Sequence, residues 1–136
     1  MISFKRLSQD DAWTIIKVIK EKIEDENKDG AVAVVDEHGE LMAFYRTDNC
    51  GFVSVKVAIN KAFTAVTEGK TTFTFAKNLK ENALDIAYLG DLRFTALGGG
   101  VPVYFDNKII GGVAFSGLSQ EEDEEIANFG ISKIKL

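Results

Sequence analysis

The residues of this chain that could carry chemistry are few. Its 136 residues include one histidine, His38, and one cysteine, Cys50. No two potential soft metal ligands have the spacing that a zinc or iron site requires. The histidine does not stand in a Ser-His-acid pattern of the kind that hydrolases use. The residues by themselves therefore predict no catalytic group, and they argue against an unassisted hydrolase or metalloenzyme.

Two glycine clusters flank a short hydrophobic hairpin in the stretch LGGGVPVYFDNKIIGGVAFSG, residues 97–117. A P-loop requires Lys and then Ser or Thr after its last glycine, but Gly100 is followed by Val101 and Pro102. The second cluster lies inside an expected strand, and the helix expected after it begins with carboxylates that would repel a phosphate. We therefore exclude a phosphate site. Two interpretations stay open: the glycines allow a helix to pack closely, or they let a ligand approach the backbone.

The composition restricts the class of partner. Sixteen basic and 21 acidic residues give a net charge of -5, so the chain lacks the basic face that nucleic acid or an anionic membrane would require. The hydrophobic content of 46% is typical of a globular domain. We expect one domain over residues 1–136, without a signal peptide or a membrane span. The single cysteine fits a reducing compartment, so we expect a cytoplasmic protein.

The pattern of apolar residues predicts the elements that must position any site. We expect a helix from the Ser8 and Asp11 capping box to about Gly30, and a second helix over 52–68 with a face of small residues. Hairpins are expected over 31–46 and 101–115, the latter turning at Asp106 and Asn107. Residues 71–75 are prone to form a strand, but whether they pair with another strand stays open. A short helix is expected before Gly90, and one more strand is expected near 93–97. A last helix follows Ser119. The order predicts an α+β fold with an antiparallel sheet of about five strands and helices on its faces.

Landmarks over residues 30–130 resemble those of one known family. They are AVAVVDEHGELMAFYRTDN, KVAINKAFTA, the glycine-flanked hairpin and DEEIA, in that order. This ordered set resembles the GlcG/HbpS family, also known as domain of unknown function 336 and as the C-terminal domain of PduO-type proteins. The resemblance implies a profilin-like fold that often forms homo-oligomers. It also implies that haem or a corrinoid is a possible cofactor, because some members bind one.

The resemblance also selects candidate ligand-binding residues. Those we retain are Arg46, Asp48, Lys61, Gly99 and Pro102. The two cations could meet the propionates of a tetrapyrrole or another carboxylate at the mouth of a pocket. The alternative is that they form internal salt bridges, for instance Arg46 with Asp48, or Lys61 with a neighbouring acid.

An axial ligand for haem or a corrinoid is harder to find. The expected imidazole could come only from His38, which falls in the first hairpin turn, where a histidine is usually solvated. Cys50, Met42 and Tyr45 are conceivable replacements.

We therefore expect a small-ligand-binding domain with a pocket near the G-G-x-P loop, for haem, another tetrapyrrole or a small anion. The alternatives are an accessory homo-oligomeric subunit without catalysis and, third, an enzyme of haem or carboxylate metabolism.

Overall fold

The centre of the fold is an antiparallel sheet. The computed structural model describes residues 1–136 and contains four strands in the spatial order β2-β1-β4-β3. Their bounds are β1 Ala31–Val35, β2 Leu41–Arg46, β3 Gly100–Phe105 and β4 Lys108–Ser116. Both predicted hairpins are confirmed, and Asp106 and Asn107 take the positive φ values of 49° and 62° that their tight turn requires. Pairing of β1 with β4 joins the two hairpins into one sheet.

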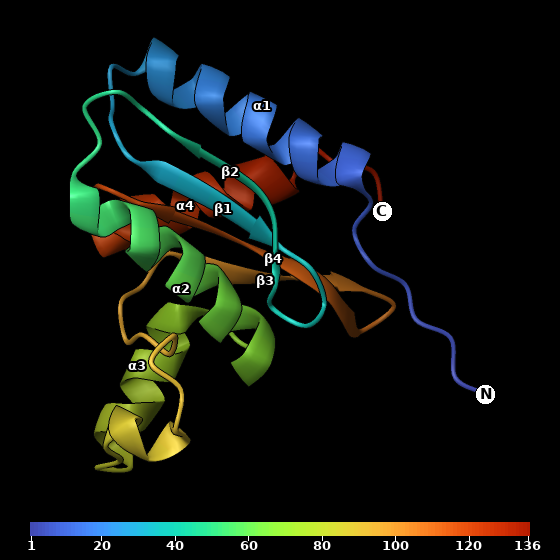
Figure 1. Ribbon diagram of the computed structural model, residues 1–136, viewed down its shortest axis with the longest axis vertical. Helices are drawn as coiled ribbons and strands as arrows, with labels where there is room; N and C mark the ends of the chain where they lie inside the picture. The colour runs from blue at the N-terminus through green and yellow to red at the C-terminus, as the bar shows by residue number, and fades with distance from the viewer.

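Helices cover both faces of this sheet. Helices α1 (Gln9–Asp25) and α4 (Gln120–Ile131) lie on one face, and α2 (Phe52–Glu68) lies on the other (Figure 1). Helix α3 (Thr72–Glu81) and the short 3-10 helix η1 (Ile86–Leu89) extend away from the body beyond α2. The predicted capping box of Ser8 and Asp11 begins α1. None of these helices is both long enough and apolar enough to cross a membrane.

Two hydrophobic cores follow from the alternation of side chains along β1. Val32 and Val34 face the core shared with α1 and α4. The smaller Ala31 and Ala33 face α2, which presents its predicted small-residue surface to them. A Cβ added at Gly112 would lie 2.6 Å from Val66 Cγ2 of α2. This glycine of the second cluster therefore serves close packing of a helix.

The sheet has four strands where we expected about five, because two segments adopt other structures. Residues 71–75 begin α3, since the Thr71 hydroxyl caps the helix by accepting from Thr74 N at 3.2 Å. Residues 93–97 do not pair with a strand. Their backbone binds a side chain of α2 instead: Thr64 Oγ1 donates to Arg93 O at 3.3 Å and accepts from Thr95 N at 3.0 Å. The short helix expected before Gly90 is reduced to η1.

Candidate functional site

The strand register brings the predicted site residues to one end of the sheet. Ala31 pairs with Arg46 on one side and with Ser116 on the other, and Phe115 N donates to Gly99 O at 3.2 Å. Arg46 and Gly99 therefore lie at opposite edges of the same end, which we call the loop end. Three strand spacings separate these edges, about 14 Å.

A buried ion pair lies beneath residues 98–100, which we call the glycine loop. Lys61 Nζ donates to Asp123 Oδ2 at 2.9 Å and to Phe115 O at 3.1 Å, and the two charged side chains are only 2% and 3% exposed. Asp123 Oδ1 also accepts from Leu118 N at 3.0 Å. Burial lowers the pKa of Lys61 below its ordinary value, and the hydrogen bond to Asp123 opposes that effect. The pair ties α2 to the first turn of α4, although the two helices cover opposite faces of the sheet.

The first glycine cluster wraps around this ion pair. A Cβ at Gly100 would lie 2.3 Å from Lys61 O, so no larger residue fits without movement of the backbone. Gly99 has φ +131°, and a Cβ there would lie 2.8 Å from Lys61 Nζ and 2.8 Å from Asp123 Cβ. Pro102 is buried in β3 opposite Gly112. Lys61, Gly99 and Pro102 are thus brought together in a packed region, and Lys61 has the internal ion pair that the sequence left open.

Arg46 and Asp48 lie apart from that region, at the other edge of the loop end. Both are exposed, and they do not form the salt bridge considered as an alternative. Asp48 lines a shallow, mostly polar hollow of about 320 Å³ together with Lys28 and Tyr45. Burial raises the pKa of the Cys50 thiol, and the charge of Arg46 opposes this. The thiol is therefore held in its protonated, less reactive form.

A pocket beside the glycine loop is lined by residues that were not among the candidates from the sequence. It measures about 270 Å³, we call it the α3 pocket, and its lining residues are Phe73, Ala76, Lys77, Lys80 and Gln120. Gln120 Oε1 accepts from Gly98 N at 2.7 Å, which fixes the loop against this pocket. Lys80 has no carboxylate partner, and Lys77 lies 3.9 Å from Glu81 in an exposed pair that contributes little. The pocket therefore combines an apolar floor with two available cations.

The signal that could have located the α3 pocket was the threonine before it. Thr71 at an N-cap places residues 73, 76, 77 and 80 on one face of a helix, because i, i+3, i+4 and i+7 share a face. Treating 71–75 as prone to form a strand hid that face.

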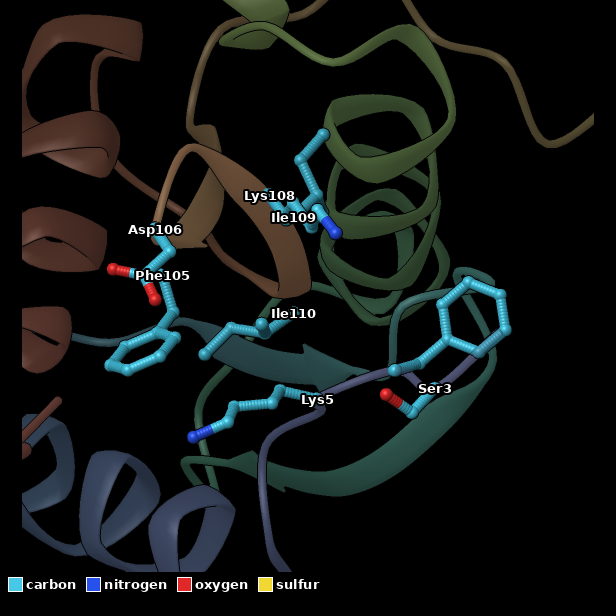
Figure 2. A pocket seen from close by; sticks show the side chains of 8 residues that line it. Ser3, Lys5, Phe105, Asp106, Lys108, Ile109 and Ile110 are labelled. Atoms are coloured by element: carbon cyan, nitrogen blue, oxygen red, sulfur yellow. The ribbon is translucent and has the colours of Figure 1, made fainter. Parts of the chain in front are cut away.

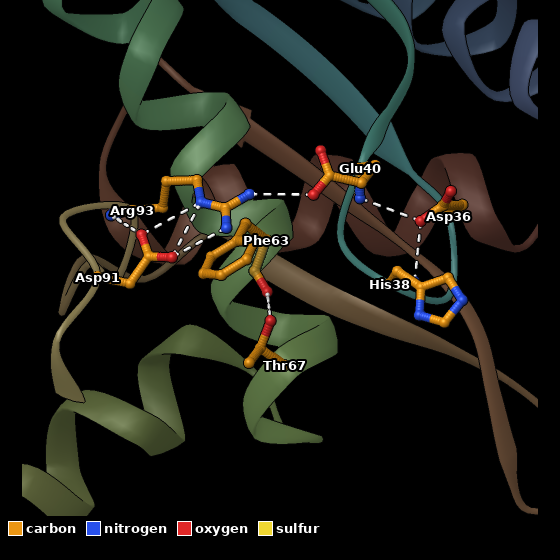
Figure 3. Close-up of polar contacts among 7 residues, drawn as sticks. All are labelled: Asp36, His38, Glu40, Phe63, Thr67, Asp91 and Arg93. Atoms are coloured by element: carbon orange, nitrogen blue, oxygen red, sulfur yellow. Dashed lines mark hydrogen bonds and ion pairs between the residues drawn. The ribbon is translucent and has the colours of Figure 1, made fainter.

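His38 lies at the opposite end of the sheet. Asp36 Oδ1 accepts from His38 N at 2.8 Å and from Glu40 N at 3.0 Å, which builds the β1–β2 turn (Figure 3). The His38 side chain is 76% exposed, and its Nε2 lies 3.5 Å from Glu37 Oε1. Since β1 separates this turn from the loop end, His38 and the glycine loop cannot contact one small ligand together.

Arg93 organises the segment that leads to the glycine loop, and no sequence pattern indicated this role. Its guanidinium lies 3.9 Å from the centre of the Phe63 ring and pairs with Asp91 at 2.9 Å and Glu40 at 3.2 Å (Figure 3). The hydrogen bond from Arg93 holds the pKa of Asp91 below its ordinary value. These contacts fasten the segment before Gly98 to α2 and to the first hairpin.

The donor set does not favour a metal. No group of three or more His, Cys, Asp or Glu side chains is placed to hold a metal ion. The α3 pocket also contains no His, Cys or Met. What this site can do chemically is hold an apolar, anionic molecule by contact and charge.

Comparison with known proteins adds independent information. The family described as "Haem degrading protein HbpS-like" matches residues 7–132. Protein GlcG of Escherichia coli K12 is 33% identical over 110 residues, 81% of each chain. A double mutant of Streptomyces reticuli HbpS superposes with a TM-score of 0.90 at 27% identity, covering 100% of this chain and 92% of that one. The complex of PduOC with haem gives a TM-score of 0.86 at 26% identity, covering 96% of each chain.

Proposed function

The chain belongs to the HbpS-like family, and from that premise we propose that it is a small-ligand-binding domain whose ligand is haem or a related tetrapyrrole. The proposed place is the α3 pocket, beside Gly98 at the loop end. One relative, PduOC, is known in complex with haem. The observation that carries the proposal for this chain is the position of an exposed apolar surface and two available lysines next to the glycine loop.

The side chains of the pocket suit the two chemical parts of a tetrapyrrole. Phe73 and Ala76 offer apolar contact to the ring, and aromatic side chains stack well on flat π-systems. Lys77 and Lys80, one helical turn apart, offer ammonium groups to the propionates. Haem, when bound, supplies a redox-active iron, and the role of this chain is to hold and orient the porphyrin.

The other candidate residues have supporting roles in this proposal. Lys61 and Gly99 fix the glycine loop through the buried ion pair, so that Gly98 stays against Gln120. Pro102 continues the loop into β3. Arg46 and Asp48, exposed at the far edge of the same end, are proposed as outer contacts for a ligand that extends beyond the pocket.

Coordination of iron is not part of the proposal, because the residues do not fit it. The α3 pocket offers no imidazole, thiol or thioether. His38 is at the other end of the sheet. Apolar contact and charge are the forces that this pocket supplies.

A haemin titration followed by the Soret absorbance tests this proposal. We expect a saturable shift that His38→Ala retains and that the double variant Lys77→Gln/Lys80→Gln weakens about tenfold, as loss of two partly exposed ion pairs predicts. Lys17→Gln is the matched control, since Lys17 is exposed on α1 and lines none of the pockets described above. Loss of the shift in His38→Ala would place the ligand at the β1–β2 turn instead. Absence of a saturable shift would refute tetrapyrrole binding.

A second function, that of an accessory subunit in a homo-oligomer, is favoured by one observation. The segment from α3 to the glycine loop exposes large apolar side chains: Phe73, Leu84, Tyr88, Leu92 and Leu97. A second copy of the chain would cover such a surface. Sedimentation of ligand-free protein tests this function: an oligomer that Leu92→Glu dissociates supports it, and a monomer contradicts it.

A further inference from the structure

Another pocket lies at the end of the sheet opposite the loop end. The N-terminal segment passes beside the tip of the β3–β4 hairpin and encloses about 220 Å³ with it (Figure 2). We call it the tip pocket, and its lining includes Lys5, Phe105, Asp106, Lys108, Ile109 and Ile110. None of these residues belongs to the site proposed above for a tetrapyrrole.

The pocket exists because β4 extends beyond β1. The last pair between the two strands is Val35 with Gly112, so the backbone of residues 108–110 has no strand on that side. Leu7 fills the vacated position: its N–H donates to Ile110 O at 3.0 Å and its side chain is buried. Residues before Leu7 then continue alongside the hairpin, and the space between them is the tip pocket.

The tip pocket has a small excess of positive charge, and its lysines have no carboxylate partner. Lys5 comes from the N-terminal segment and points toward Phe105, whereas Lys108 comes from the hairpin and its ammonium group lies beside Ile109, so the two are on opposite sides of Ile110 (Figure 2). Neither lysine forms a salt bridge. Lys5 lies 4.7 Å from the centre of the Phe105 ring. With Asp106 as the only carboxylate in the lining, two positive charges and one negative leave one positive charge in a chain whose net charge is -5.

We propose that the tip pocket binds a small monocarboxylate with an apolar body. The apolar body contacts Phe105, Ile109 and Ile110, and the carboxylate pairs with the ammonium group of Lys5 or of Lys108. The tip pocket is enclosed by the N-terminal segment and the hairpin, so its volume restricts the ligand to a single ring or a short chain, whereas the α3 pocket is an open hollow from which a larger ring can protrude.

The lining also discriminates against other anions. Inorganic phosphate carries more charge than the single excess positive charge can balance, and Asp106 repels it. It also leaves the apolar floor uncovered, which loses the main favourable term of binding. An uncharged analogue covers the floor but leaves both lysines without a counter-ion.

The experiment is a calorimetric titration of the full chain with benzoate and hexanoate, with benzamide as the uncharged match for benzoate. We expect saturable binding of at least one acid, and benzamide at least fivefold weaker than benzoate. Whichever of Lys5→Gln and Lys108→Gln removes the paired ammonium group should weaken binding of the acid about twofold to fivefold, the range for one exposed ion pair, and the other should change it little. Lys17→Gln should leave it unchanged. Circular dichroism of each variant verifies that the fold is retained.

Three outcomes would overturn the inference. Neither acid binds; or benzamide binds as tightly as benzoate; or phosphate competes with benzoate at equal concentration. The haemin titration separates this inference from the function proposed above. Lys5→Gln should not alter the Soret shift, whereas displacement of benzoate by haemin would show that the two pockets are not independent sites.

Discussion

The two ends of the sheet use lysine in opposite ways. At the loop end Lys61 is buried, paired with Asp123 and enclosed by Gly99 and Gly100. At the opposite end of the sheet, which holds the tip pocket and which we call the tip end, Lys5 and Lys108 are exposed, unpaired and separated by apolar side chains. A buried charge must be fully partnered, so Lys61 is committed to holding the fold. An exposed lysine without a salt bridge can pair with a ligand. The contrast between Lys61 and the two exposed lysines indicates that the cations available for binding lie at the surface pockets.

The comparison predicts the largest loss of stability at Asp123. Asp123→Ala leaves Lys61 buried without its counter-ion and Leu118 N without its acceptor. The free energy of unfolding should fall by about 3–5 kcal/mol, as for other buried pairs broken on one side. Denaturant unfolding measures this.

The control for Asp123→Ala is Glu125→Ala, which removes an exposed carboxylate from the same helix. Similar losses in the two variants would mean that the ion pair does not hold the loop end. The double variant Lys61→Met/Asp123→Asn should recover much of the loss, because it removes the buried charge and keeps an acceptor for Leu118 N.

A smaller loss is expected from enlarging the glycine loop. Gly100→Ala places a methyl group 2.3 Å from Lys61 O, a backbone atom that cannot move without shifting α2. We expect a loss of about 2–3 kcal/mol, near the upper part of the range for overpacked positions. Thermal and denaturant unfolding measure it against Gly51→Ala, whose new Cβ would meet no atom within 4 Å and which should lose only the smaller preference for glycine over alanine at the N-cap of α2. Equal stability of the two variants would show that the loop end is more adaptable than its contacts imply.

The smallest loss is expected at the tip end. Tyr104 donates from its hydroxyl to Gly69 O at 2.9 Å in an exposed position. Tyr104→Phe should reduce the free energy of unfolding by only about 0.5 kcal/mol, because water replaces the lost hydrogen bond. Tyr88→Phe, which removes an exposed hydroxyl without a protein partner, is the control. A loss at Tyr104 as large as that at Gly100 would remove the contrast between the two ends.

Local patterns predicted the parts of the fold that local chemistry determines. The capping box at Ser8, the turn at Asp106 and Asn107, and the small face of α2 are each readable within a few residues, and the structure confirms them. The family resemblance is also confirmed. At residues 71–75, whose strand pairing was left open, an N-cap and tertiary packing outweighed strand propensity.

The candidate site was less predictable because its contacts are distant in sequence. Lys61 meets a carboxylate 62 residues later in the chain, and Arg93 meets Glu40, 53 residues earlier. Neither spacing has a local signature. The cations of the α3 pocket became visible only when the segment was known to be a helix, since helical geometry is what gathers Phe73, Lys77 and Lys80 on one face.

The strand order also dictates when this chain can fold during synthesis. The central strand β1 pairs with β4 along one edge, and Ala31 of β1 lies opposite Ser116 of β4. Until the ribosome has released that last strand, a nascent chain presents the apolar residues 31–35 with one edge open. Long-range pairing of this kind folds slowly and exposes intermediates to aggregation. Truncation before residue 116 should therefore yield insoluble fragments. Cellular chaperones would bind the nascent chain after the first hairpin has been synthesised and before the second is complete.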